Sequence, residues 1–447
     1  MNYHSAPSEP VTATEHHVPR TYAWFVFALS FGLLISDYMS RQVLNAIFPL
    51  LKSEWALSDA QLGSLAGVIA LAVGILTFPL SLFADRWGRV KSLVLMAVIW
   101  SVATLACGIS QNYNQMLLAR LFVGVGEAAY GSVGIAVVLT VFPTSMRATL
   151  TGAFMAGGLF GSVLGVGIGG ILAAHFGWRM AFIGMAAFGL FLALMYFYVV
   201  RESRINPNNV HKQPDSERLV SSEKSPLRSI ASSKSVICAY LGSGLQLFIA
   251  SAVIAWMPSY LNRCYGMALD RAGVVAAGFI LAGSLGMIIW GIISDKFGKG
   301  RPERKLTLVL ALCLTSCVLL SVGFSLSAGS AQLSLVAIGM FFATGTSGPA
   351  GAMVANLTNP SVHGSAFATL TLANNLLGLA PAPFVIGLLA DKFGLYAAFQ
   401  LMPLIAIFSA SIFWVCKRSY LNDLKKAQFH TSENQTESNI AACRSHA

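Results

Sequence analysis

Apolar residues in this chain gather in long runs instead of alternating with polar ones. Each run is about 18 to 29 residues long, so a helix rising about 1.5 Å per residue can cross the roughly 30 Å core of a bilayer. Helices also satisfy their own backbone hydrogen bonds, which lipid requires. The pattern predicts an all-α integral membrane protein with twelve transmembrane helices, near residues 22–40, 60–84, 92–110, 113–141, 150–173, 179–200, 234–260, 272–293, 304–327, 332–357, 364–389 and 394–416.

Three polar segments flank or divide these runs. Residues 201–233, rich in Ser, Lys and Glu, separate two sets of six. We therefore expect an N-terminal six-helix bundle at 22–200, a linker at 201–233 and a C-terminal six-helix bundle at 234–416. Residues 1–21 lack the apolar core of a cleaved signal peptide, so we expect them to form an N-terminal tail, with a C-terminal tail at 417–447.

Basic residues are spread unevenly over the predicted loops. The chain has 29 Lys and Arg against 18 Asp and Glu, a net charge of +11. Twelve spans place both termini on one side, and if that side is inside, 22 of the 29 basic residues lie in inner segments. This bias predicts cytoplasmic tails and a cytoplasmic linker. Because the charge is dispersed over short loops, it argues against a nucleic-acid-binding patch. The five predicted outer residues are Lys52, Arg179, Arg263, Arg271 and Lys392.

The remaining composition excludes several classes of protein. Apolar residues make up 55% and charged residues only 11%, which excludes a disordered chain and disfavours a water-soluble domain. The seven cysteines include no Cys-x-x-Cys pair, so we expect no disulfide framework and no metal site. Since neither a Walker A motif nor a nucleophile–base–acid set is recognisable, the sequence predicts neither an ATP-driven pump nor an enzyme, and no cofactor.

The two halves of the chain repeat a short loop. SLFADRWGR follows the second span and GIISDKFGK follows the eighth. A second pair, FGWRMAF at 176–182 and FGLYAAF at 393–399, precedes the sixth and twelfth spans. Internal repeats of six spans are typical of secondary transporters. We predict that the first pair forms gating loops, in which an Asp meets a cation or a helix N-terminus. Their residues are Asp85, Arg86, Gly88, Arg89, Gly291, Asp295, Lys296 and Gly298.

The charged side chains that we single out in the first and fourth spans all belong to the N-terminal half. Asp37 and Arg41 are four residues apart, and Arg120 and Glu127 are seven apart, so each pair shares a helix face. A charge within the membrane costs several kcal/mol unless it is paired or hydrated, and is a functional hypothesis by default. We predict proton coupling through Glu127 and Asp37. The alternative is a static ion pair that fixes the first helix against the fourth.

The predicted substrate-binding residues come from both halves. A Glu between two arginines can exchange partners, and its protonation frees an arginine for an anionic group. The C-terminal half offers neutral polar and aromatic groups that can shape the cavity. The predicted set is Arg41, Arg120, Tyr130, Gln246, Trp256, Asn374 and Asn375.

The duplicated loop resembles the signature of the major facilitator superfamily, and the resemblance covers essentially the whole chain. One departure is Ser81, where the family usually has Gly; the second copy keeps Gly291. The resemblance implies two pseudo-symmetric six-helix bundles that work by alternating access. It also implies a bacterial inner-membrane protein that is a monomer with a small-molecule substrate, protons and the bilayer as partners.

Two branches of that superfamily share the Arg41, Arg120 and Glu127 pattern. The Spinster-like branch, associated with lysolipids, is favoured by flanking residues such as Gly177-Trp178-Arg179; the anion:cation symporter branch, associated with sugar acids and other carboxylates, comes second. Both usually place Asp directly before the first-span Arg, where this chain has Ser40. Asp37, one helical turn earlier, can substitute for it.

The resemblance and the charges together predict a secondary transporter of a small organic anion or an amphipathic, lysolipid-like solute, coupled to protons through Glu127. A proton-driven exporter of drugs or metabolites is the alternative. A function of a different class, as a non-transporting membrane sensor or a membrane enzyme, is the less favoured hypothesis. The sequence leaves the substrate, the direction of transport and the stoichiometry open.

Overall fold

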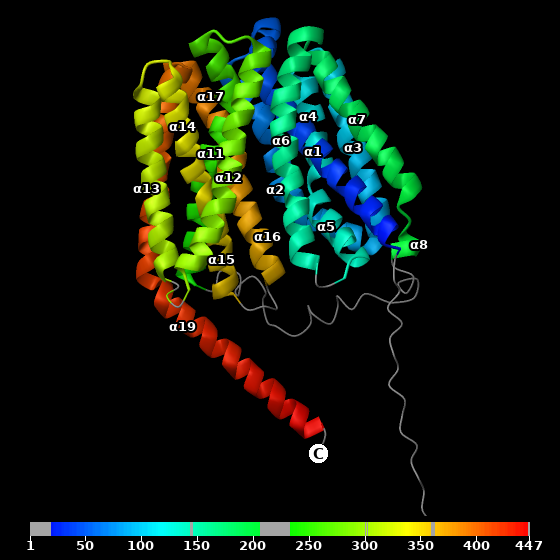
Figure 1. Cartoon of the computed structure of the whole chain (residues 1–447), viewed down its shortest axis with the longest axis vertical. Helices are drawn as coiled ribbons and strands as arrows, with labels where there is room; N and C mark the ends of the chain where they lie inside the picture. Colours follow the sequence, from blue (N-terminus) through cyan, green and yellow to red (C-terminus); the bar gives the residue numbers. More distant parts are fainter. Residues whose placement is uncertain are drawn as a thin grey trace, which may run out of the picture.

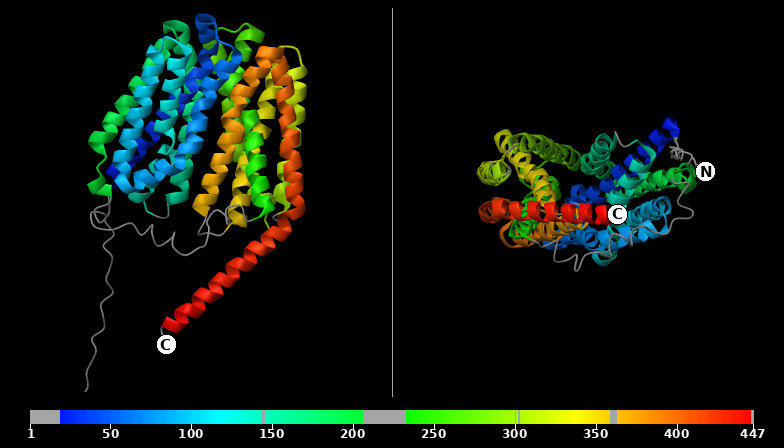
Figure 2. Two further views of the ribbon diagram at one scale, coloured as in Figure 1. Left: turned by 180° about the vertical axis from the view of Figure 1, so that it is seen from behind. Right: turned by 90° about the horizontal axis from the view of Figure 1, so that it is seen from below.

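A computed structural model of the chain describes residues 19–445 except 144–145, 206–232, 300, 302 and 359–362. Most of the predicted N-terminal tail and most of the predicted linker lie outside the described residues. Twelve helical spans in the described part are long and apolar enough to cross a membrane, as the sequence predicts. The fold is therefore all-α and membrane-spanning, with two six-helix bundles (Figures 1 and 2).

The N-terminal bundle contains α1 (Arg20–Trp55), α2 (Asp59–Trp87) and α3 (Arg89–Ile109), then the broken fourth span α4 (Tyr113–Glu127) and α5 (Tyr130–Val141), then α6 (Arg147–Phe176) and α7 (Trp178–Val199). A short helix, α8 (Glu202–Ile205), follows. The C-terminal bundle contains α11 (Lys234–Tyr265), α12 (Leu269–Phe297), α13 (Glu303–Ser325), and three spans built from shorter pieces. The tenth span consists of α14 (Ser330–Ala343), η3 (Thr344–Thr346) and α15 (Ser347–Leu357). The eleventh consists of α16 (His363–Asn374), η5 (Asn375–Leu379) and α17 (Pro381–Phe393). The twelfth consists of α18 (Leu395–Leu401), η6 (Met402–Leu404) and α19 (Ile405–Ser445).

Two helices are longer than the hydropathy pattern predicts. α1 continues past residue 40, through Arg41 and Pro49, to Trp55. Its polar residues face the interior of the protein, so they end the apolar run without ending the helix. α19 continues into the predicted C-terminal tail as far as Ser445 and projects away from the bundles in Figure 1.

Two of the four interrupted spans break beside a candidate site residue. The break between α4 and α5 comes directly after Glu127, and the Thr77 hydroxyl donates to the freed Ala128 carbonyl at 2.7 Å. In the eleventh span, Asn375 begins a π-helical turn that ends before Pro381. Single π-turns inside α-helices occur frequently at functional sites.

The two bundles pack closely through glycines. A Cβ added at Gly63 of α2 would collide with the Pro383 carbonyl of α17, and one at Gly170 of α6 would lie 2.8 Å from the Leu269 carbonyl of α12. Such contacts let helix backbones approach each other, as is usual in membranes. α2 therefore packs on α17, and α6 on α12.

These contacts lie toward the end of the bundles that is away from the chain termini, which we call the far side; the opposite end is the termini side (Figure 2). On the far side, Asp59 at the start of α2 forms ion pairs with Lys52 at 2.6 Å and with Arg263 of α11 at 2.7 Å. Asp391 of α17 accepts hydrogen bonds from the backbone N–H groups of Asp59 and Ala60 at 2.7 and 2.9 Å. Charged groups therefore join the two bundles at their far side.

Candidate functional site

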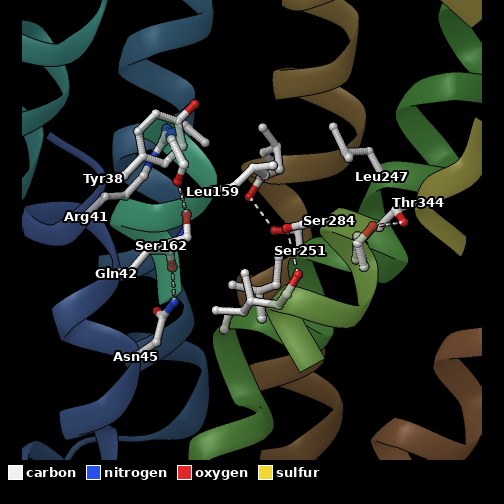
Figure 3. A pocket seen from close by; sticks show the side chains of 18 of the residues that line it. Tyr38, Arg41, Gln42, Asn45, Leu159, Ser162, Leu247, Ser251, Ser284 and Thr344 are labelled. Carbon is white, nitrogen blue, oxygen red and sulfur yellow. Dashed lines mark hydrogen bonds between the residues drawn. The ribbon is translucent and has the colours of Figure 1, made fainter. Parts of the chain in front are cut away.

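A cavity of about 370 Å³ lies between the two bundles. Helices α1, α2, α4 and α6 line it from the N-terminal half; α11, α12, α14, η3, η5 and α17 line it from the C-terminal half. Figure 3 shows side chains of both halves facing each other across this space. A pocket between two bundles that combines apolar lining with a few polar groups is the usual form of a small-molecule site.

One face of α1 supplies most of the polar lining. Tyr38, Arg41, Gln42 and Asn45 all line the cavity, at a spacing of three, four and seven residues that places them on one side of a helix. The Asn45 amide donates to the Gln42 side-chain oxygen at 2.6 Å (Figure 3). This polar face is why the apolar run of the first span ends early in the sequence.

Arg41 is the central charged group of that face. Its Nε lies 3.8 Å from a Glu127 carboxylate oxygen, beyond hydrogen-bond distance, and its side chain keeps 19% of its surface exposed. One terminal nitrogen of Arg41 is buried and has no hydrogen-bond partner among the described residues. Both Glu127 oxygens are likewise unpartnered there. The Arg41 side chain thus lines the cavity while its guanidinium keeps hydrogen-bonding capacity that the described residues do not use.

Asp37 lies beside Glu127. Both residues are buried, and their carboxyl groups are close enough to share a hydrogen bond when one of them is protonated. Ser40, at the position where the related branches usually carry Asp, is fully buried with an unpartnered hydroxyl. The carboxyl group beside Glu127 comes from Asp37, one helical turn before Ser40, and its role in proton coupling stays a prediction.

Arg120 has a different environment. Its side chain is buried, with only 1% of the residue exposed. Its three nitrogens donate to backbone carbonyls: Nε to Leu65 at 3.2 Å, and the terminal nitrogens to Ser40 at 3.0 Å and Arg41 at 2.9 Å. Arg120 therefore joins α4 to α1 and α2 and fixes the backbone that carries Arg41.

The C-terminal half presents a largely apolar wall. Of its residues that line the cavity, none carries a charge, and only Ser251, Ser284 and Thr344 have polar side chains. Each of these hydroxyls already donates to a backbone carbonyl, of Leu379, Ile280 and Gly283 respectively (Figure 3). The other lining residues of this half are Leu247, Ala250, Ile254, Ala255, Ile280, Gly283, Met287, Met340, Leu379 and Pro383.

Five predicted substrate-binding residues are not among those that line this cavity. Tyr130 donates to the Ser30 carbonyl at 2.8 Å, and Gln246 donates to Ser316 at 3.0 Å, both in buried surroundings. Trp256 donates to the Pro383 carbonyl at 2.9 Å and packs on Phe48 across the bundle interface. Their role as substrate ligands stays a prediction, as does that of the remaining two.

The remaining two are the neighbouring asparagines of the eleventh span. Asn375 lies at the π-turn and donates to the Thr371 carbonyl at 2.9 Å. Asn374 has a buried side-chain oxygen without a hydrogen-bond partner in the described part of the chain. Asn375 lies at the interface with α2, where Gly74 approaches its side chain.

The predicted gating loops form contacts within their own halves. Asp85 pairs with Arg89 at 2.9 Å, and Asp295 pairs with Lys305 at 2.8 Å. Gly88 has φ of 111°, a conformation that L side chains rarely adopt, and it precedes α3. The α3 N-terminus is capped by Glu202 of α8, which accepts from the Val90 N–H at 3.0 Å. The gating role of all eight predicted loop residues, including Arg86, Gly291, Lys296 and Gly298, stays a prediction.

Sequence reasoning missed the charged group on the far side. Asp391 occupies a further copy of the duplicated pattern, because Gly387, Asp391 and Gly394 have the same spacing as Gly291, Asp295 and Gly298. That spacing could have identified it. The partners of Asp59 could not be identified in this way, because Arg263 lies in the other half of the chain and meets it only through folding.

Comparisons with known proteins agree with this architecture. The family model described as Major Facilitator Superfamily matches residues 29–381 and 239–436. The chain is 25% identical to the hexuronate transporter of Bacillus subtilis over 386 residues, which cover 84% of this chain and 90% of that protein. It is 26% identical to the gallate transporter of Pseudomonas putida over 420 residues, covering 83% and 92%.

The crystal structure of a bacterial homologue of the human lysosomal transporter Spinster, in an inward-facing and unoccupied conformation, matches with a TM-score of 0.83. At 20% sequence identity, that match covers 90% of this chain and 98% of the other and supports the fold. The duplicated loop, the twelve spans and the family match together show that this chain belongs to the major facilitator superfamily.

Proposed function

We propose that this protein is a proton-coupled secondary transporter that moves a small organic anion across the bacterial inner membrane by alternating access. The observation that carries the proposal is the state of Arg41: it lines the central cavity, its Nε lies 3.8 Å from Glu127, and one guanidinium nitrogen has no partner among the described residues. A buried cation with free donors is an energetically costly arrangement unless a ligand completes it. A carboxylate is the group that best matches a guanidinium.

The same geometry supports a coupling mechanism. A substrate carboxylate that binds Arg41 competes with Glu127 for the same cation, which is 3.8 Å away. When Glu127 loses this partner, neutralising it with a proton avoids two carboxylates beside one arginine. Asp37 lies beside Glu127 and provides a second acceptor through which that proton can move. Anion binding and proton binding then favour each other, as a symporter requires.

The arrangement of contacts supports an assignment of the conformation. Ion pairs and glycine contacts join the bundles on the far side, whereas the Asp85 and Asp295 loops on the termini side bond within their own halves. We assign the termini side to the cytoplasm from the charge bias of the loops. The structure then corresponds to an inward-facing state, with the cavity closed to the far side.

The experiment is a comparison of two transport modes in proteoliposomes. For the Glu127→Gln variant we expect substrate exchange to persist, while accumulation driven by a pH gradient falls to background. Glu54→Gln is the matched control, because Glu54 lies at the far-side end of α1, paired with Arg179 outside the cavity. Wild-type accumulation in Glu127→Gln would refute the coupling role, and joint loss of exchange and folding would support the static ion pair.

An amphipathic, lysolipid-like solute is the second candidate, favoured by the apolar wall of the C-terminal half. The anionic headgroup of such a solute would also bind Arg41. Thermal stabilisation of the purified protein by lysophospholipids, and not by small carboxylates, would select it. Counterflow of the stabilising compound would show that the protein transports it, and would exclude a non-transporting sensor.

A further inference from the structure

The two walls of the cavity set limits on the substrate that the family relationship does not. We propose that the transported anion is a compact monocarboxylate whose body is apolar or aromatic, rather than a polyhydroxylated sugar acid or a dicarboxylate. This inference rests on the proposed function and adds the chemistry of the substrate body to it. Three features of the cavity carry it: the number of available cations, the state of the hydroxyls and the size of the space.

The number of available cations limits the substrate to one carboxylate. Of the two arginines that line the cavity, Arg120 has all three nitrogens bonded to backbone carbonyls and is almost completely buried. Arg41 alone has an unpartnered nitrogen. Glu127 and Asp37 lie behind it and repel additional negative charge. A second substrate carboxylate would therefore enter the cavity without a cation to balance it.

The state of the hydroxyls limits the polarity of the body. A sugar acid that enters the cavity must exchange the water around its hydroxyl groups for partners in the protein, or leave them unsatisfied. The three hydroxyls of the C-terminal wall have already donated their protons to backbone carbonyls, as has Ser162 of α6 to Gly158. The surfaces between them come from Leu, Ile, Met and Ala side chains. This wall suits a hydrocarbon face.

The distribution of polar groups gives the substrate an orientation. Gln42 and Asn45 lie beside Arg41 on the same face of α1 and can contact the carboxylate or one polar substituent next to it. The Asn45 side chain lines the cavity, and its amide nitrogen donates to Gln42, so the two amides form one polar patch beside Arg41. The head of the anion would face α1, and its body would lie against Leu247 and Ile254 of α11.

The size of the space favours a short molecule over a long lipid. At about 370 Å³, the cavity is near the lower end of the range for small-molecule pockets, about 300–1,000 Å³. A ring or short chain with one carboxylate fits within such a space, whereas an acyl chain of lipid length would project from its termini-side opening.

The test measures binding and counterflow with a panel of defined probes on the purified full-length protein. Benzoate and cyclohexanecarboxylate provide apolar bodies, glucuronate a hydroxylated ring, isophthalate a second carboxylate, and benzamide an uncharged analogue. We expect benzoate and cyclohexanecarboxylate to bind at least tenfold more tightly than glucuronate or isophthalate. Benzamide should show no binding at the same concentrations. Arg41→Gln should abolish the binding of benzoate.

A second pair of variants tests the wall itself. Leu247→Gln and Ile254→Asn add hydrogen-bonding groups to the apolar surface, so each should lower the ratio of benzoate affinity to glucuronate affinity. Tighter binding of glucuronate, isophthalate or a lysophospholipid by the wild type would overturn the inference. If those anions exchange through an Arg41-dependent site, the proposed transport of anions still stands. If no carboxylate exchanges, the proposed function fails, and this inference fails with it.

Discussion

The two halves of the molecule share a fold but contribute different chemistry to the cavity between them. The N-terminal half places four ionisable side chains at or near the site, Asp37, Arg41, Arg120 and Glu127. The lining residues of the C-terminal half carry no charge, and their three polar side chains donate to backbone carbonyls. The difference teaches that charge and shape can be assigned to different bundles: in the proposed mechanism the N-terminal bundle couples the proton, and the C-terminal bundle provides the surface against which the substrate packs.

The halves also differ in how they close at their two ends. On the far side, Asp59 and Asp391 form bonds that cross from one bundle to the other. On the termini side, Asp85 and Asp295 bond within their own bundles. A transporter that alternates between two closures needs such contacts to be formed at one end at a time. The far-side contacts are therefore the ones that must break during the opposite half of the cycle.

The largest expected effect is on stability and comes from Arg120. Arg120→Gln removes hydrogen bonds to three carbonyls on α1 and α2, so we expect it to lower the stability of the folded state by about 3–5 kcal/mol. Thermal unfolding in detergent measures this change. If the Arg120→Gln protein has wild-type stability but fails to bind anions, Arg120 is a substrate ligand. Arg120 would then not differ from Arg41 in its role.

The next effect is on the balance between conformations. Asp391→Asn weakens two charge-assisted hydrogen bonds to the start of α2, each worth about 1.5–3 kcal/mol, so the far side should open at least tenfold more often. Alkylation of a single cysteine introduced near the far-side end of α2 reports that opening. Glu54→Gln is the matched control on the far side, because its partner Arg179 lies in the same half, and it should leave the alkylation rate unchanged. Equal rates in both variants would contradict the role assigned to Asp391.

The smallest effect is expected on the apolar wall. Ser284→Ala and Thr344→Val remove hydroxyls that donate to carbonyls of α12, so the affinity for the substrate should change by no more than about twofold. Equilibrium binding to the purified variants measures this. A loss of tenfold or more would show that these hydroxyls contact the substrate, and the C-terminal half would then contribute to polar recognition.

The topology could be predicted from the sequence because lipid requires long apolar helices, and hydropathy detects them directly. Arg41 and Glu127 could also be selected, since charges inside spans are rare enough to be conspicuous. The end of the first helix could not, because the polar face of α1 that lines the cavity resembles a loop in composition. The role of Arg120 was equally hidden: its partners are backbone carbonyls, which leave no mark in a sequence.

The pairing across the bundles was the least predictable feature. Asp59 and Arg263 are separated by 204 positions, and only the packing of α2 against the C-terminal half brings them together. Asp391 did carry a sequence signal, the repeated spacing of Gly387, Asp391 and Gly394, but its partners are the backbone N–H groups at the start of α2. Repeats therefore indicate where equivalent residues lie, while the contacts themselves depend on the conformation.

The most direct measurement of the central claim is the number of protons taken up when an anion binds. Calorimetric titration of the purified protein with a carboxylate that binds it, repeated in buffers of different ionisation enthalpy, gives this number. Because the anion displaces Glu127 from Arg41, the proposed mechanism predicts uptake of about one proton in the wild type, with affinity rising as the pH falls. It predicts no proton uptake in Glu127→Gln. Equal uptake in the wild type and in that variant would contradict the mechanism.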